Sequence, residues 1–170
     1  SGLQILAGLA ADQSTAELVN VVPSNKPSDA YKAVAEQAKE FLPTYMHHWM
    51  TRAVCKRTVM TIPYNATKDS SRKYIRESLL EEGIDPTKDE LTQIVNAVYN
   101  SMDTIVPGPM QVMRWIKKHV GQYIRNGATA VEWVTPSGFI VNQRRDDIET
   151  MRMELQLLGR TQVRLSLIHI

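Results

Sequence analysis

The spacing of apolar residues changes once along this chain of 170 residues, and that change constrains the fold more than any other feature. Up to residue 125, apolar residues recur every three or four positions, which is the period of an amphipathic α-helix. From residue 130 onward they alternate with polar residues, as Met151 and Met153 do with Arg152 and Glu154, which is the period of a strand. We therefore predict about five helices followed by two or three strands, an α+β fold in which helices predominate.

Capping residues and chain breakers predict where these elements begin and end. Ser28 suits an N-cap, Gly83 suits a C-cap, and Thr87 with Glu90 forms a capping box. Proline and glycine supply the breaks between helices, most strongly at Pro107-Gly108-Pro109. The predicted helical segments are 3–11, 28–42, 44–62, 70–82, 87–105 and 110–125. The predicted hairpin joins 130–134 to 139–141 through the turn Pro136-Ser137-Gly138. Residues 166–170 fit no element.

Composition excludes several classes of protein. The single cysteine, Cys55, excludes an internal disulfide framework and a multi-cysteine zinc site. No apolar run approaches the roughly 18 residues of a membrane span, and the start of the chain lacks a secretory signal pattern, so we expect no membrane partner. The formal net charge of +2 is too small to indicate an anionic partner by itself.

The basic residues are concentrated in one stretch, residues 51–76. Seven basic residues and one acid, Asp69, give this stretch a formal charge of seven minus one, or +6. Such a concentration favours an anion-facing surface, although a solvated basic helix face is an equally simple interpretation. The seven are Arg52, Lys56, Arg57, Lys68, Arg72, Lys73 and Arg76.

Within this stretch, Arg52, Lys56, Met60 and Tyr64 follow one another at intervals of four residues. On a helix this interval places all four along one face, over about 18 Å at about 1.5 Å per residue. Two cations followed by a flexible apolar side chain and a phenol would suit a triphosphate, a base and a sugar laid along the helix. A helix with a basic start and an apolar end is the simpler alternative.

The remaining candidate residues carry weaker signals. His47 and His48 are adjacent, so on a helix they point about 100° apart, and they lack a nearby third metal ligand. Cys55 lies beside two cations that could lower its pKa, but a small apolar residue inside a helix is the simpler interpretation. His119 lies on an apolar stripe and is expected at the edge of the core. The acids of 77–90 suit a metal site or a solvated surface equally, and the usual catalytic motifs are absent.

Residues 51–64 read T-R-A-V-C-K-R-T-V-M-T-I-P-Y and resemble the fingers helix, motif B, of single-subunit RNA polymerases of the phage and mitochondrial type. The family pattern there is T-R-x-V-x-K-R-x-V-M-T-x-x-Y-G. Three further segments resemble the family in the same order: S-G-L-Q at 1–4, V-N-V-V-P-S at 19–24 with Asp29 and Tyr31, and W-V-T-P-S-G-F at 133–139. On these segments the chain is identified as a member of the family from residue 1 to about residue 159.

The resemblance implies a DNA-directed RNA polymerase, a nucleotidyltransferase that synthesises RNA from ribonucleoside triphosphates on a DNA template. It places the phosphates of the incoming nucleotide at Arg52 and Lys56, with Arg57 close by, and the sugar at Tyr64. Lys56 and Tyr64 would be the catalytic residues of this chain. Met60, at a position where related DNA polymerases carry Phe or Tyr, favours an RNA polymerase.

By the same resemblance, several residues would contact nucleic acid. Gly2 and Gln4 would lie in the palm near the nascent RNA and the template, and Arg72 and Lys73 would contact the nucleic-acid backbone. Asn65 replaces the glycine that follows the motif tyrosine in the family. Asparagine tolerates left-handed backbone better than most residues, but its side chain would intrude towards the template.

The resemblance also implies Mg²⁺ in the intact enzyme, held by two palm aspartates that orient the triphosphate and offset developing charge. Neither aspartate matches a position in this chain, and we expect the first before Ser1 and the second beyond Ile170. The sequence therefore assigns no metal ligand, and the chain should be inactive alone. The alternative is a non-catalytic, helical nucleic-acid-binding module.

As part of a right-hand polymerase, the chain would begin with palm- and fingers-adjacent helices at 1–43. The fingers would cover 44–128, with the nucleotide-binding helix at 44–64. A palm-side hairpin and strand would follow at 129–165, and then an unassigned tail at 166–170. The expected partners are DNA template, nascent RNA and ribonucleoside triphosphates. No obligate protein partner is expected, because the family enzymes act as single subunits. The expected setting is the cytoplasm of a phage host, or alternatively a mitochondrion or plastid.

Overall fold

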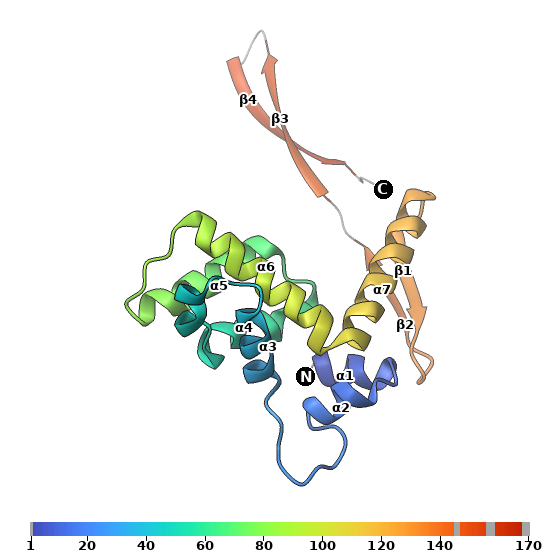
Figure 1. Cartoon of the computed structure of the whole chain (residues 1–170). Helices are drawn as coiled ribbons and strands as arrows, with labels where there is room; N and C mark the ends of the chain where they lie inside the picture. Colours follow the sequence, from blue (N-terminus) through green and yellow to red (C-terminus); the bar gives the residue numbers. More distant parts are fainter. Residues whose placement is uncertain (1, 145–146, 156–158, 168–170) are drawn as a thin grey trace. The chain divides into compact units, whose positions relative to one another are not determined.

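The computed structural model describes residues 2–144, 147–155 and 159–167, and the chain forms two compact units, 1–114 and 115–170 (Figure 1). Helices predominate and strands follow them, which confirms the predicted α+β class. The first unit holds α1 (Gly2–Leu9), α2 (Gln13–Leu18), α3 (Ala30–Lys39), the 3-10 helix η1 (Thr44–Trp49), α4 (Arg52–Thr61), the 3-10 helix η2 (Ile62–Tyr64), α5 (Lys68–Glu81), α6 (Lys88–Ile105) and the start of α7 (Pro107–Arg125). The second holds the rest of α7 and the strands β1 (Ala130–Val134), β2 (Ile140–Arg144), β3 (Asp147–Leu155) and β4 (Gly159–Leu167).

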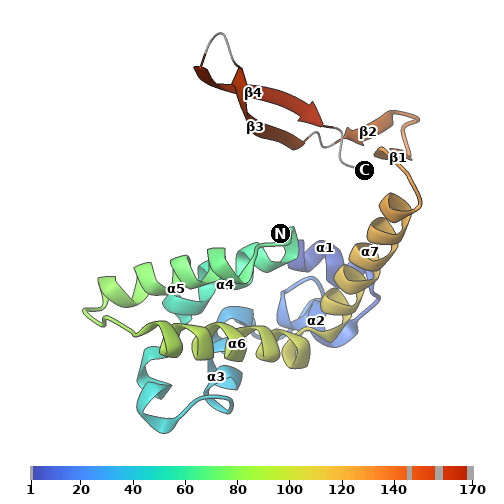
Figure 2. The same ribbon diagram turned by 90° about the horizontal axis from the view of Figure 1, so that it is seen from above.

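Four helices, α3 to α6, surround the interior of the first unit (Figure 2). α3 packs against α4 and α6, and α5 packs against the same two helices, which also contact each other. Their apolar stripes meet in the interior, where Val34, Val59, Leu79 and Ile94 are all 0% exposed. Full burial of such a side chain stabilises a fold by about 1.5–3 kcal/mol. These buried contacts therefore fix α4 in place, while its opposite face stays exposed.

α6 follows its prediction closely. Thr87 Oγ1 accepts a hydrogen bond from Glu90 N, and the Glu90 carboxylate accepts one from Thr87 N at 2.8 Å, so the predicted capping box is present. Gly83, at φ 78°, ends the preceding helix as predicted. The predicted apolar stripe of α6 is buried: Leu91, Ile94, Val95, Val98 and Met102.

The single long helix predicted over 44–62, and extended to 44–64 as the nucleotide-binding helix, is wrong. The segment forms η1, breaks at Met50 and Thr51, and continues as α4 and η2. The break has a physical cause, because Thr51 has an extended backbone and its Oγ1 accepts a hydrogen bond from Val54 N at 3.3 Å. Thr51 therefore caps a new helix, whose first residue is Arg52.

α3 has Asp29, and not the predicted Ser28, as its N-cap. The Asp29 carboxylate accepts hydrogen bonds from Tyr31 N at 3.0 Å and from Lys32 N at 3.1 Å. The backbone N of Ser28 donates to Asn20 Oδ1 and its backbone O accepts from Asn20 Nδ2, both at 2.8 Å. A carboxylate satisfies two free amides at the helix start where the serine hydroxyl would satisfy fewer, so the helix begins one residue later.

The helix predicted over 3–11 is α1, which ends two residues early, and α2 was not predicted. α1 ends at Leu9, and α2 follows with Asp12 as its N-cap, whose carboxylate accepts from Thr15 N at 3.1 Å. The same carboxylate accepts from Gly108 N, in the first turn of α7, at 2.9 Å. Pro107-Gly108-Pro109 thus starts α7 directly, and only Val106 separates α6 from α7.

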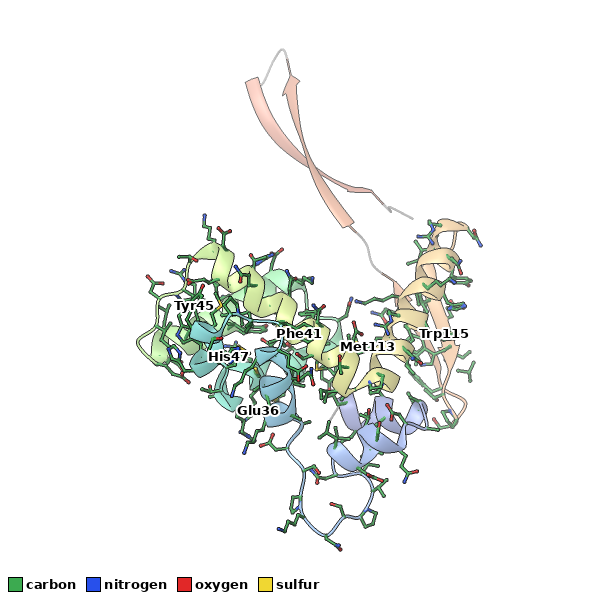
Figure 3. All side chains as sticks on the ribbon, viewed as in Figure 1. Glu36, Phe41, Tyr45, His47, Met113 and Trp115 are labelled. Atoms are coloured by element: carbon green, nitrogen blue, oxygen red, sulfur yellow. The ribbon has the colours of Figure 1, made fainter. Side chains whose placement is uncertain are left out.

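The apolar face predicted for α7 is largely exposed. Trp115 is 62% exposed and Tyr123 is 53% exposed, and Figure 3 shows the Trp115 side chain projecting from the helix. His119, expected at the edge of a core, is exposed too, and its ring lies 4.3 Å from that of Trp115 between centroids. The spacing of the apolar residues predicted the helix correctly, but spacing alone does not show whether another element covers the apolar face.

β1 and β2 pair antiparallel with Trp133 opposite Val141, which confirms the predicted hairpin. Gly138 closes the turn, with a φ of 82° and a hydrogen bond from its N to Thr135 O of 2.8 Å. A positive φ of this kind favours glycine, which has no Cβ atom.

The period-two stretch forms β3 as predicted, and it pairs antiparallel with β4, with Met151 opposite Val163. β4 was not predicted. It includes residues 166–167, so the predicted unassigned tail begins too early, and residues 168–170 lie outside the described part of the chain.

Candidate functional site

Arg52, Lys56, Met60 and Tyr64, which we call the α4 line, form one exposed edge of α4 and η2. All four residues are exposed, and Met60 and Tyr64 leave 47% and 71% of their surface free. Tyr64 lies in the 3-10 turn η2 that directly continues α4. The spacing therefore gives the shared face that it predicts. The opposite face of α4 is buried and consists of Val54, Cys55, Thr58 and Val59.

Arg52 is held by residues at the start of α3. Its Nε donates a hydrogen bond to Asp29 Oδ2 at 2.5 Å, and its guanidinium carbon lies 5.3 Å from the centroid of the Tyr31 ring. Burial alone would raise the pKa of Asp29, but the hydrogen bond from Arg52, the backbone amides of α3 and the charge of Arg52 hold it below its ordinary value. Asp29 is thus a carboxylate that stays ionised beside the guanidinium.

A cavity of about 510 Å³ opens beside Arg52 in the first unit. Its polar lining includes Gln4 from α1 and Ser28 and Asp29 from the start of α3. Gln4 Nε2 donates to Val19 O at 3.0 Å, which ties α1 to the end of α2. The structure therefore brings together two residues singled out in the sequence, Gln4 and Arg52, at one polar cavity.

Lys56 and Arg57 are neighbours in the sequence with different surroundings. Lys56 is exposed and has no ion-pair partner within residues 2–143, so its charge is available to a ligand. Arg57 Nη1 donates to Glu77 Oε2 at 2.8 Å, and its guanidinium carbon lies 4.1 Å from the centroid of the Tyr74 ring. The structure thus places Arg57 against α5, where it ties α4 to α5.

Gly2, predicted to lie near nucleic acid, packs against the end of the α4 line. A Cβ atom at Gly2 would stand 2.8 Å from Pro63 Cβ and 3.1 Å from Tyr64 Cζ. The distance to Pro63 is shorter than real Cβ atoms accept and the distance to Tyr64 is tight, so the absence of a side chain at Gly2 is what lets η2 lie there.

Asn65 has the left-handed backbone that the family glycine would allow, with φ 65° and ψ 33°. Its N donates to Ile62 O at 2.9 Å, and Ala66 N donates to Thr61 O at 3.3 Å. These two bonds close the turn that follows Tyr64. The substitution therefore keeps the turn's backbone, because asparagine enters this conformation at small cost.

Arg72 and Lys73 lie on α5, a different helix from the one that carries Arg52 and Lys56. Arg72 is half-buried and pairs with Asp69 one turn earlier, and Lys73 is exposed. The structure thus does not bring these two residues together with Arg52 through any described contact.

Two residues that matter for this geometry were not among the predicted site residues. Asp29 belongs to a segment that resembles the family but has no predicted role of its own, although an acidic residue just before a helix is a recognisable cap signal. Tyr99 hydrogen-bonds through its hydroxyl to Ala66 O at 3.0 Å, across 33 residues of sequence. No local pattern in the sequence indicates that contact.

Cys55 and His47, the weaker candidates, make contacts that are typical of structural residues. Burial raises the pKa of the Cys55 thiol to about 12, so Cys55 is the interior residue of the simpler interpretation. His47, labelled with Tyr45 on η1 in Figure 3, lies 3.0 Å from Leu42 O through Nε2.

No group of three or more His, Cys, Asp and Glu residues in the described segments could hold a metal ion. Among the same residues, none of the helices is both long and apolar enough to cross a bilayer.

The sequence is similar to known proteins along nearly its whole length. A family model described as DNA-dependent RNA polymerase matches residues 1–165. The mitochondrial DNA-directed RNA polymerase of Homo sapiens is 31% identical over 156 residues, and that of Schizosaccharomyces pombe is 29% identical over 160 residues. T7 RNA polymerase of Escherichia phage T7 is 24% identical over 214 residues.

These matches cover most of the chain and a small part of each relative. They take in 84% of the chain but 13% of the human protein, and 79% of the chain but 14% of the S. pombe protein. For the phage protein the shares are 94% of the chain and 24% of the relative. The chain thus spans between 13% and 24% of the length of these relatives.

Proposed function

Since this chain belongs to the DNA-dependent RNA polymerase family of the single-subunit type, we propose that it forms the nucleotide-binding part of an enzyme that synthesises RNA from ribonucleoside triphosphates on a DNA template. The observation that carries the proposal is the unbroken exposed line from Arg52 to Tyr64, with two cations at one end and a phenol at the other. The regions proposed are palm- and fingers-adjacent helices at 1–43, fingers at 44–128 and a palm-side hairpin and strand at 129–165.

The phosphates of the incoming nucleotide lie at the start of the line. Because Asp29 accepts from Nε of Arg52, the two terminal nitrogens of the guanidinium are free to donate to phosphate oxygens in a forked arrangement. Lys56, one turn further along, adds a point charge that follows the phosphates as they move. Two cations fixed on one helix orient the triphosphate before the reaction and offset the charge that develops in it.

The sugar and the base lie at the other end of the line. Tyr64 presents its phenol to the sugar and favours ribose over deoxyribose, and Met60 packs against the nucleotide between phosphate and sugar. Both side chains are exposed enough to do so without any rearrangement of the core. Asn65 borders the template at the turn that follows Tyr64.

Further contacts with nucleic acid belong to the same proposal. Gln4, at the polar cavity beside Arg52, faces the template and the nascent RNA, while Gly2 contributes by receiving the Tyr64 ring. Arg72 and Lys73 neutralise backbone phosphates, which makes that part of the binding weaken as salt concentration rises. Arg57 supports the site indirectly by fixing α4 to α5.

The residues that this structure describes do not fit a catalytic Mg²⁺. None of their His, Cys, Asp and Glu side chains form a group of three or more that could hold a metal ion. Asp29, the carboxylate beside Arg52, is engaged by that guanidinium and by the amides of α3. A requirement for Mg²⁺ belongs to the proposal for the whole enzyme, and no step is assigned here to a metal held by these residues.

The proposed partners are the DNA template, the nascent RNA and ribonucleoside triphosphates, with no obligate protein partner. The relatives include phage and mitochondrial polymerases, so the proposal covers an enzyme of either setting.

Template-directed incorporation tests this function. The full-length protein that contains this chain is given a primed DNA template and one labelled ribonucleotide at a time. We expect incorporation only of the ribonucleotide complementary to the template base. Binding of the template without any incorporation would favour the alternative, a non-catalytic nucleic-acid-binding module.

A further inference from the structure

Tyr99, in the middle of α6, reaches across to the turn that follows Tyr64. Its hydroxyl donates a hydrogen bond to Ala66 O at 3.0 Å, although the two residues are 33 positions apart in the sequence. We propose that Tyr99 is a positioning residue, which fixes the direction of Tyr64 and thereby helps the enzyme to prefer ribose over deoxyribose. This inference rests on the function proposed above for Tyr64.

Tyr64 needs such support because its own side chain is little restrained. It is 71% exposed, and its ring lies against the bare backbone of Gly2. The direction of its ring therefore depends on the backbone that carries it. A sugar that differs by one hydroxyl is discriminated only by a partner held in a defined place.

The backbone after Tyr64 is held from two sides. On the α4 side, Asn65 N donates to Ile62 O at 2.9 Å and Ala66 N donates to Thr61 O at 3.3 Å. On the α6 side, Ala66 O accepts from the Tyr99 hydroxyl. The first pair of bonds closes the turn on its own helix, whereas the Tyr99 bond joins it to a helix on another side of the core.

The Tyr99 hydroxyl is itself oriented by its surroundings. It lies 3.2 Å from Ser71 Oγ, and Ser71 is 0% exposed. Because Tyr99 donates its one proton to Ala66, Ser71 is the donor to Tyr99, which makes a directed chain of two hydrogen bonds. Lys68 Nζ lies 5.5 Å from the centroid of the Tyr99 ring and donates to Asn96 Oδ1 at 2.8 Å, which restrains the ring as well.

Tyr99→Phe removes this support, together with the acceptor of the buried Ser71 hydroxyl. The ring stays and continues to pack against the core, so α5 and α6 keep their contact. Ala66 is half-buried, so water can replace the lost hydrogen bond to its carbonyl and the fold survives. A matched control is Tyr74→Phe on α5, since the Tyr74 ring lies under Arg57 and its hydroxyl has no hydrogen bond to the turn.

The experiment measures kcat/KM for a ribonucleotide and for the matching deoxyribonucleotide, in the full-length protein that contains this chain. We expect Tyr99→Phe to lower the ratio of the two about fivefold, as the loss of one hydrogen bond would. Tyr74→Phe should leave the ratio unchanged. In a Tyr64→Phe background, Tyr99→Phe should have no further effect, because it acts through Tyr64.

Hydrogen exchange gives a second readout that does not depend on catalysis. We expect the Asn65 and Ala66 amides to exchange faster in Tyr99→Phe, with the amides of α6 unchanged. Unchanged exchange at the turn, or an equal loss of selectivity with and without Tyr64, would overturn the inference. A loss in Tyr64→Phe without a loss in Tyr99→Phe contradicts this inference alone, whereas an unchanged ratio in Tyr64→Phe contradicts the proposed role of Tyr64 itself and this inference with it.

Discussion

The backbone of Gly2 lies against the ring of Tyr64, and a Cβ atom at Gly2 would stand 3.1 Å from Tyr64 Cζ and 2.8 Å from Pro63 Cβ. Two segments that resemble the same enzyme family, residues 1–4 and 51–64, therefore meet at one point in space. The meeting point is the end of the exposed line on α4 that is proposed to select the sugar. A glycine at position 2 is required there chiefly by the space that Pro63 takes, and the phenol ring lies close beside it.

Gly2→Ala should therefore lower the free energy of unfolding by about 1–3 kcal/mol, because the new methyl group overpacks the contact. Gly8→Ala is the matched control on the same helix, since nothing lies within 4 Å of a Cβ atom there. That variant should be neutral or stabilise the helix by about 0.4–1 kcal/mol. Urea unfolding of both variants checks the difference, and equal effects would contradict the close packing of Gly2.

Asp12 should make stability depend on pH. Burial alone would raise the pKa of its carboxyl, but hydrogen bonds from Thr15, Ser14 and Gly108 hold it far below its ordinary value of 3.8. A folded-state pKa below the unfolded one contributes stability that is present above pH 3.8 and lost as the pH falls towards the folded-state value. Asp12→Ala should cost about 1–2 kcal/mol at neutral pH, since it also removes a helix cap.

Urea unfolding of the wild type and Asp12→Ala at a series of pH values measures this contribution. The gap in unfolding free energy between the two should narrow as the pH is lowered below 3.8. A gap that stays constant with pH would show that the ionised carboxylate contributes nothing beyond its shape.

Thr58→Val should stabilise the fold by about 1 kcal/mol. Thr58 is 0% exposed on the buried side of α4, and its Oγ1 has no hydrogen-bond partner among the residues that the structure describes. Valine has nearly the same shape and buries no hydroxyl. Thr61→Val is the control, because Thr61 Oγ1 does donate to backbone carbonyls, those of Arg57 and Thr58. Thermal unfolding should show a higher midpoint for the first variant only.

Local signals in the sequence predicted the elements that are fixed locally. The capping box of Thr87 and Glu90 and the apolar stripe after it gave α6 correctly. The turn with Gly138 gave the β1–β2 hairpin. In both cases the residues that decide the structure lie within a few positions of one another, so the pattern contains the physical cause.

The errors arose where two local signals competed or where the cause lies far away in the chain. The apolar and basic pattern over 44–62 suggested one helix, but Thr51 caps a new one and divides the segment. The line from Arg52 to Tyr64 was predictable from its spacing, because α4 and the turn η2 that directly continues it carry all four residues. The ion pair of Arg52 with Asp29 and the bond from Tyr99 to Ala66 depend on how helices pack, which no spacing reveals.

The central claim is that the α4 line binds a nucleoside triphosphate through its cations, and Lys56→Ala tests it most directly. Lys39→Ala is the matched control, because Lys39 pairs with Glu36 on α3 outside the basic stretch. Steady-state kinetics of RNA synthesis by the full-length protein should show a KM for the nucleotide raised about tenfold or more, or an equivalent fall in kcat, for Lys56→Ala. Lys39→Ala should match the wild type. Unchanged kcat and KM in Lys56→Ala would contradict the claim.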